Sequence, residues 1–137
     1  MFTNTGLTHA VATEFVAGTP ITPWYLGLIN NSPTPTLAGG DTLASHTGWS
    51  EIAYSTGYTG NRPAWGNGAV SGNATTNAST VNFAMLGTYT VYGLFVCSVA
   101  TGTTGTLSCT AAFSGGTQGV SNGDTLQCSM TISAVSG

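Results

Sequence analysis

The segment YTVYGLFVCSVA, residues 89–100, is the longest nearly unbroken apolar run of the chain, and its residue types favour a β-strand over a helix. One face of this strand is expected to carry Val91, Gly93, Phe95, Cys97 and Val99, and the other face Tyr92, Leu94 and Val96. A strand that is apolar on both faces is covered on both sides, so we expect it inside a sandwich core or a tight subunit contact. A glycine at its centre predicts a bulge or a second backbone passing close.

The rest of the chain is almost free of charged side chains. Of its 137 residues, 4% are Asp, Glu, Lys or Arg, whereas about 25% is usual for a soluble domain. Thr, Ser, Asn and Gly make up the difference. A surface of this kind is poorly protected against association. The composition therefore predicts that much of the surface is covered, either by copies of the chain or by a partner.

The charge balance also excludes several classes of partner. One basic side chain and a net charge of −3 do not suit direct binding of nucleic acid or a polybasic membrane contact. No apolar run approaches the ~20 residues that a membrane-spanning helix needs. The N-terminal sequence MFTNTGLTHA lacks the features of a signal peptide, so we expect synthesis in a cytoplasm without export by a cleaved signal.

The first 18 residues are expected to form a short helix, or an arm that orders only on a partner. A helix over residues 4–17 would be capped by Asn4 or Thr5. It would carry an apolar stripe of Leu7, Val11 and Phe15. Because several residues of this segment are mediocre helix formers, we expect docking to hold the helix.

The remaining pattern predicts one β-rich domain that spans residues 1–137. Strands are expected at residues 24–29 and 52–54, and alternating apolar residues predict further strands at 81–85, 107–113 and 126–134. Residues 57–80 are rich in Gly, Asn, Ser and Thr and are expected to form a long loop that is functional or lies on a partner. The predicted fold is an antiparallel β-sandwich or a small jelly-roll-like barrel with one N-terminal helix.

Three cysteines fall in the predicted strands, at Cys97, Cys109 and Cys128. Their number is odd and no CxxC spacing occurs, which argues against a disulfide framework. We expect buried free thiols that pack as small apolar side chains.

Residues with catalytic chemistry are few. His46 lies five residues from both Asp41 and Glu51 and follows Ser45. These residue types are those of a Ser-His-Asp catalytic triad or of a divalent metal site. No GxSxG turn or metal-binding helix motif supports either reading. We expect His46 to hydrogen-bond a loop backbone or to stack near Trp49. The sequence predicts no enzyme activity, no metal and no cofactor.

Carbohydrate chemistry is a further alternative. Paired carboxylates for glycoside cleavage would have to come from Glu14, Asp41, Glu51 and Asp124. Trp24, Trp49 and Trp65 could offer a surface on which sugars stack. Tryptophans are more often core or interface anchors, and nothing in the sequence brings two of the carboxylates together.

Arg62 is the only basic side chain, and Pro63 follows it. We expect it to form an internal structural clamp with Glu51 or Asp41, with its guanidinium on Trp49 or Trp65.

Six short motifs carry a resemblance to a known family. In order they are WYLGLI (24–29), DTLASHTGWSE (41–51), RPAW (62–65), GLF (93–95), GTTGTL (102–107) and NGDTL (122–126). Together they resemble a family of small virion proteins encoded among the structural genes of tailed bacteriophages, over roughly residues 24–134. The resemblance implies a decoration or cement protein on the capsid surface, without catalytic residues. A tail or fibre component that binds a host receptor or glycan is the alternative.

The expected partners are the major capsid protein and copies of the chain itself. A homotrimer is favoured and a dimer is possible, since closed cyclic symmetry lets identical subunits bury matching surfaces. Contacts are expected from the 57–80 loop, the N-terminal arm 1–5, and the side chains of Trp49, Trp65, Phe2 and Tyr58.

Overall fold

The computed structural model describes residues 1–134, in which one helix precedes ten strands. The helix is α1 (Asn4–Phe15). The strands are β1 (Trp24–Asn30), β2 (Ser50–Glu51), β3 (Ala64–Trp65), β4 (Ala74–Thr76), β5 (Val81–Ala84), β6 (Tyr89–Cys97), β7 (Leu107–Ala112), β8 (Gln118–Val120), β9 (Thr125–Cys128) and β10 (Thr131–Ser133). The fold is mainly β, as the sequence predicts.

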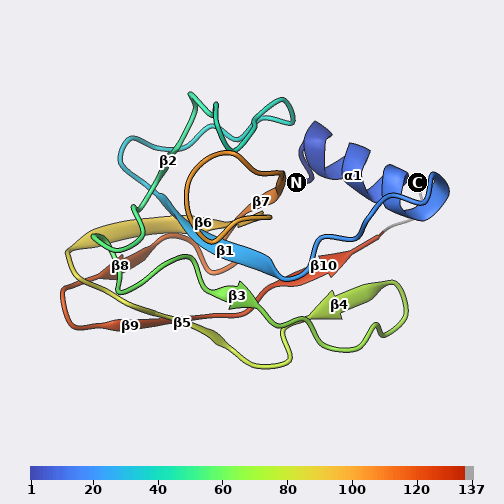
Figure 1. Cartoon of the computed structure of the whole chain (residues 1–137). Helices are drawn as coiled ribbons and strands as arrows, with labels where there is room; N and C mark the ends of the chain where they lie inside the picture. The colour runs from blue at the N-terminus through green and yellow to red at the C-terminus, as the bar shows by residue number, and fades with distance from the viewer. Residues whose placement is uncertain (135–137) are drawn as a thin grey trace.

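The strands form two layers in a β-sandwich-like arrangement. The large sheet has six strands in the order β2-β1-β6-β7, with β3 also paired to β1 and β8 to β6. Two two-stranded sheets, β5–β9 and β4–β10, form the second layer, and the pairs between named strands are antiparallel. Figure 1 shows the second layer along one side of β1 and β6, and the segment between β1 and β3 arching over the other side.

Both faces of β6 are buried, which confirms the prediction for this strand. The first core lies between the two layers and includes Leu26, Leu28, Leu94, Val96, Phe83 and Met130. The second core lies on the opposite face of the large sheet and consists of Ile29, Leu43, Trp49, Phe95, Cys97 and Leu107. The segment between β1 and β2 supplies Leu43 and Trp49, so an irregular stretch of chain, and not a third sheet, covers the second face.

The alternation predicted for this strand is wrong at its start. The register of β6 with β1 shifts, because Ile29 pairs with Gly93 and Asn30 pairs with Val91. Tyr92 is therefore an extra residue in a β-bulge, which moves the preceding side chains to the opposite face. Val91 packs in the first core and Tyr92 against the second. Gly93 adjoins the bulge, and a Cβ there would collide with the carbonyl oxygen of Ala111 in β7, so both expectations for this glycine are confirmed.

Three of the predicted elements differ in detail. The short strand expected at residues 52–54 is instead Ser50–Glu51, because Ile52 turns into the first core and Gly57 N–H closes a turn on the carbonyl of Ala53 at 2.7 Å. The 57–80 segment is not a free loop, since it contains β3 and β4. The long strand expected over residues 126–134 is divided into β9 and β10, which pair with different partners.

The N-terminus is anchored to the large sheet and is not a detached arm. Phe2 forms an antiparallel bridge with Cys109 of β7, and Thr3 N–H donates to the carbonyl of Ser108 at 3.0 Å. Thr3, and not Asn4 or Thr5, caps α1, because its hydroxyl accepts from Gly6 N–H at 3.1 Å. Thr3 is fully buried, so the cap and the anchor are one residue.

Helix α1 docks with the face opposite to its apolar stripe. Gly6 is its buried residue, and a Cβ there would collide with the backbone of Ser108. His9 packs edge-on against Trp24, with ring centroids 5.5 Å apart. The apolar stripe points away from the sheet, with exposed fractions that run from 49% for Leu7 to 82% for Phe15. Small and polar residues therefore hold the helix, and its apolar face is left uncovered.

Candidate functional site

The side chain of Arg62 forms the predicted clamp, and its partner is Glu51. Nε donates to Oε1 at 2.7 Å and Nη2 donates to Oε2 at 2.6 Å, a two-bond pairing with the carboxylate. Nη1 donates to the carbonyl oxygens of Val99 at 3.3 Å and Gly102 at 2.9 Å. The side chains of Arg62 and Glu51 are 1% and 16% exposed. The clamp therefore joins β2, the residues just before β3 and the chain after β6.

Two aromatic rings flank the guanidinium, but they are not the predicted tryptophans. Its carbon lies 4.9 Å from the ring centroid of Tyr54 and 5.4 Å from that of Phe95. Burial lowers the pKa of Arg62, but the hydrogen bond to Glu51 and its negative charge outweigh this effect, so the pKa is raised. Burial, followed by the carboxylate of Glu51, raises the pKa of the nearby Tyr58 hydroxyl. Both groups hold their protons, which suits a fixed structural role and not proton transfer.

Asp41 and His46 take part in a separate cluster around Trp49. Asp41 Oδ2 accepts from Trp49 Nε1 and from Ala38 N–H, each at 2.9 Å. The ring of His46 stacks on Trp49 with centroids 3.9 Å apart, and its Nδ1 lies 3.1 Å from the Trp49 carbonyl oxygen. This confirms the structural interpretation of His46. Asp41 is thus a partner of Trp49 and not of Arg62. Of the two carboxylates expected for the clamp, Asp41 is therefore wrong and Glu51 is correct.

The structure does not bring Asp41, His46 and Glu51 together as a catalytic or metal-binding site. Asp41 points its hydrogen-bonding oxygen at Trp49, while Glu51 is paired with Arg62. Within residues 1–134, no three His, Cys, Asp or Glu side chains gather closely enough to hold a metal ion. No helix within that range is long and apolar enough to cross a membrane.

The expected contact residues are mostly inside the protein. Trp49, Trp65 and Tyr58 are buried, so they cannot present a surface to a partner, and the same burial removes two of the three tryptophans from any sugar-stacking surface. Their large rings fill the two cores of the protein. Phe2 is 36% exposed and remains a predicted contact.

The three cysteines are free and buried, as predicted. Burial raises the pKa of all three thiols, to about 11 for Cys109 and about 12 for Cys128. A thiol is a weak nucleophile compared with a thiolate. These cysteines therefore act as core side chains.

Asn77 has a structural role that the sequence did not indicate. Its Oδ1 accepts from Trp65 Nε1 at 2.9 Å and from Met130 N–H at 2.8 Å, and its Nδ2 lies 3.2 Å from the Cys128 carbonyl oxygen. The side chain thus replaces backbone pairing at the junction of β9 and β10. Its only sequence signal is the motif Asn77-Ala78-Ser79, which resembles a glycosylation site and points to the wrong chemistry.

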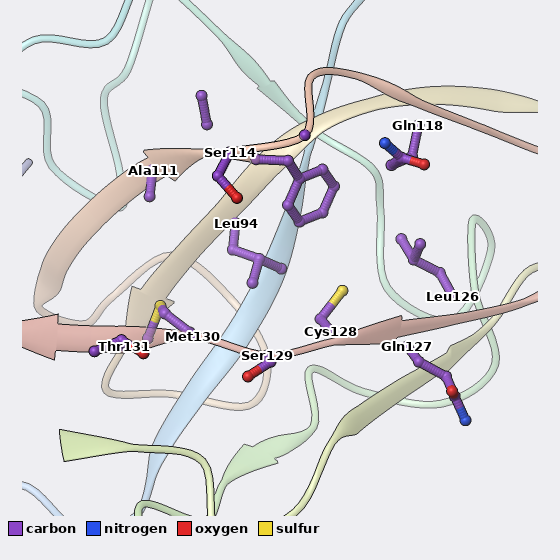
Figure 2. A pocket seen from close by; sticks show the side chains of 13 residues that line it. Leu94, Ala111, Ser114, Gln118, Leu126, Gln127, Cys128, Ser129, Met130 and Thr131 are labelled. Atoms are coloured by element: carbon purple, nitrogen blue, oxygen red, sulfur yellow. The ribbon is translucent and has the colours of Figure 1, made fainter.

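A groove between the two layers is a further feature that the sequence did not predict. It has a volume of about 540 Å³ and is bounded by the end of β7, the turn after it, and the β9–β10 segment. Figure 2 shows Leu94 and Cys128 pointing into the space between these elements. Its residues lie in three separate parts of the chain, so no local pattern marks it.

The fold and these clusters define a small β-sandwich-like protein held by a buried ion pair. Comparison of the chain with known protein families, with curated proteins and with solved structures finds no match.

Proposed function

We propose that this protein is a structural component of a tailed bacteriophage virion, and that it serves as a decoration or cement protein on the outer capsid surface. The motif resemblance over residues 24–134 supports this role. The composition supports this role independently, because a surface poor in charge suits a protein whose surface is buried against other subunits in the assembled particle.

The observation that carries the proposal is the outward apolar face of α1. Leu7, Val11, Phe15 and Val16 are all at least 49% exposed, while the opposite side of the helix docks on the sheet. The helix carries one acidic residue, Glu14, and no basic residue. Apolar side chains grouped on one exposed face mark an interaction surface more often than single exposed residues do.

The proposed partners are the major capsid protein and further copies of this chain, with a trimer favoured over a dimer. Each oligomer would tie neighbouring capsid subunits together and oppose the outward pressure of packaged DNA. Many modest contacts acting at once give avidity. Direct contact with nucleic acid or membrane is not part of the proposal.

The first experiment compares complete virions with virions that lack this protein. Particles without it should lose their DNA at lower temperature and in low salt, and complete particles should carry hundreds of copies. Equal resistance of the two kinds of particle would refute the cement role. A few copies confined to the tail would support the receptor-binding alternative instead.

The second experiment tests the helix face directly. Phe15→Ser and Val11→Ser should weaken binding to stripped particles, while the free energy of unfolding changes by no more than about 0.5 kcal/mol, since both side chains are exposed. Val70→Ser is the matched control, because Val70 is 72% exposed but lies far along the chain, between β3 and β4. Unchanged binding of the helix variants would remove α1 from the contact.

A further inference from the structure

The groove between the layers has an apolar floor and an uncharged rim. Leu94, Cys128 and Met130 are buried beneath it, and Phe113 and Leu126 are half-buried beside them. Ser, Gln, Thr, Gly and Ala complete the lining, which contains no charged side chain. The groove therefore suits an uncharged guest with apolar side chains on one face.

One wall of the groove is an unpaired strand edge. Met85 N–H donates to Asp124 O at 2.8 Å, and Ala134 N–H donates to Asn73 O at 2.9 Å. Because backbone groups in an antiparallel strand alternate in direction, residues 126, 128, 130 and 132 face β5 and β4. Gln127, Ser129 and Thr131 then direct their N–H and C=O groups the other way. All three are exposed and line the groove.

The opposite wall is the outer edge of β7, and part of that edge already holds an extended segment. Met1 O accepts from Thr110 N–H at 2.9 Å, and Thr3 pairs with Ser108. By the same alternation, Ala112 faces outward next along this edge. Ala112 is exposed and lines the groove. The pairing made by residues 1–3 thus stops where the groove begins.

We propose that this groove binds an extended, uncharged segment of another polypeptide, which adds as a β-strand between β7 and the β9–β10 edge. Main-chain hydrogen bonds to both walls would supply affinity, and alternate apolar side chains would contact Leu94 and Met130. The edge over residues 127–131 accommodates a guest of about five to seven residues at ~3.4 Å per residue. The inference does not depend on the proposed function.

A second copy of this chain is a poorer occupant. Each strand in residues 1–134 already pairs on at least one edge within its own chain, so in these residues a second copy offers no free strand that could pair with both walls. The longest connection, between β1 and β2, contains the exposed Pro33 and the buried Pro35, and proline lacks the N–H that pairing needs. The guest strand is therefore expected from a different protein.

The experiment uses the blocked peptide acetyl-TVTVTVT-amide and amide hydrogen exchange of the whole chain. At about 1 mM peptide, exchange at Ala112, Gln127, Ser129 and Thr131 should slow by about tenfold, in a saturable manner. The same peptide N-methylated at every second residue loses donors on one side and should protect much less. Ser129→Pro removes one edge donor at a position where edge strands accept proline, so it should weaken the protection, whereas Ser129→Ala should not.

Three outcomes would overturn the proposal. The first is the absence of protection by the unmodified peptide. The second is equal protection by the N-methylated peptide, which would mean apolar adsorption without strand pairing. The third is protection that rises with protein concentration in the absence of peptide, which would assign the edge to a second copy. The peptide comparison on the unaltered protein decides the matter even if Ser129→Pro fails to fold.

Discussion

Arg62 and Glu51 are joined by two parallel hydrogen bonds, although each belongs to a different short segment attached to β1. Glu51 pairs with Ile29 at one end of β1, and Ala64, two residues after Arg62, pairs with Tyr25 at the other end. The ion pair therefore ties together two edge segments that are too short to be stable alone.

Removal of this ion pair from one side should be strongly destabilising. Arg62→Ala leaves the carboxylate of Glu51 half-buried and unpaired, and we expect a loss of about 3–5 kcal/mol in the free energy of unfolding. Urea denaturation measures this loss. Arg62→Lys keeps the charge but not the two-bond geometry, so it should recover only part of the stability. A loss below ~0.5 kcal/mol for Arg62→Ala would mean that the clamp does not contribute to the stability of the fold.

The docking of α1 depends on the missing side chain of Gly6. In an isolated helix, Gly→Ala stabilises by about 1 kcal/mol. Here Gly6→Ala should instead cost about 1–3 kcal/mol, because the added methyl group collides with Ser108. Thermal unfolding followed by circular dichroism measures the change. Gly40→Ala is the control, since a Cβ at Gly40 meets nothing within 4 Å. If Gly6→Ala were as stable as the unaltered protein, the helix would not be docked at this point.

The Asn77 amide should be needed for the junction of β9 and β10. Asn77→Ala removes its three hydrogen bonds, leaves Trp65 Nε1 without its acceptor, and should cost about 1–3 kcal/mol. Trp65 should also change its fluorescence emission, which chemical denaturation and fluorescence record together. Asn61→Ala, at an exposed asparagine, should do neither. Asn77→Asp keeps the acceptor oxygen, so its loss in the free energy of unfolding should lie between those of Asn77→Ala and Asn61→Ala.

The buried thiols predict a loss of stability at high pH. Folding raises the pKa of Cys109 to about 11 and of Cys128 to about 12, from an ordinary value of 9.0. The folded state therefore holds these protons more tightly than the unfolded state, and their stabilising effect is complete below pH 9.0 and is lost as the pH rises towards 12.

Urea unfolding at several pH values tests this prediction. Tyrosines also titrate in this range, so the comparison is with the double variant Cys109→Ala and Cys128→Ala, whose stability should fall less steeply. Identical pH profiles would contradict the assignment. Thiol labelling of the native protein should be slow, and denaturant should release three reactive thiols.

The sequence predicted the parts of the fold that depend on local pattern. The apolar run around Phe95 and the alternation of Val81 and Phe83 mark strands whatever they pack against. Pairing of Arg62 with an acidic residue followed from the scarcity of charge, since few carboxylates were available.

The remaining features depend on contacts that a local pattern does not contain. The periodicity of Leu7, Val11 and Phe15 indicates an apolar helix face, but not whether that face meets this chain or another protein. The bulge at Tyr92 reverses the face of Val91 without altering the composition of the strand. The groove is formed by the edges of strands, and the sequence of a strand does not say which edge stays unpaired.

The single Arg62 and the proline after it have a practical consequence for detecting the protein. Trypsin cleaves after Lys or Arg, and the chain has no Lys and a single Arg that is followed by Pro63, a bond that trypsin cuts poorly. Trypsin would thus release no short peptides from these 137 residues, so a tryptic peptide count of the particles that we propose contain the protein would overlook it. Chymotrypsin, which cleaves after aromatic residues, or intact-mass measurement is the appropriate way to count its copies.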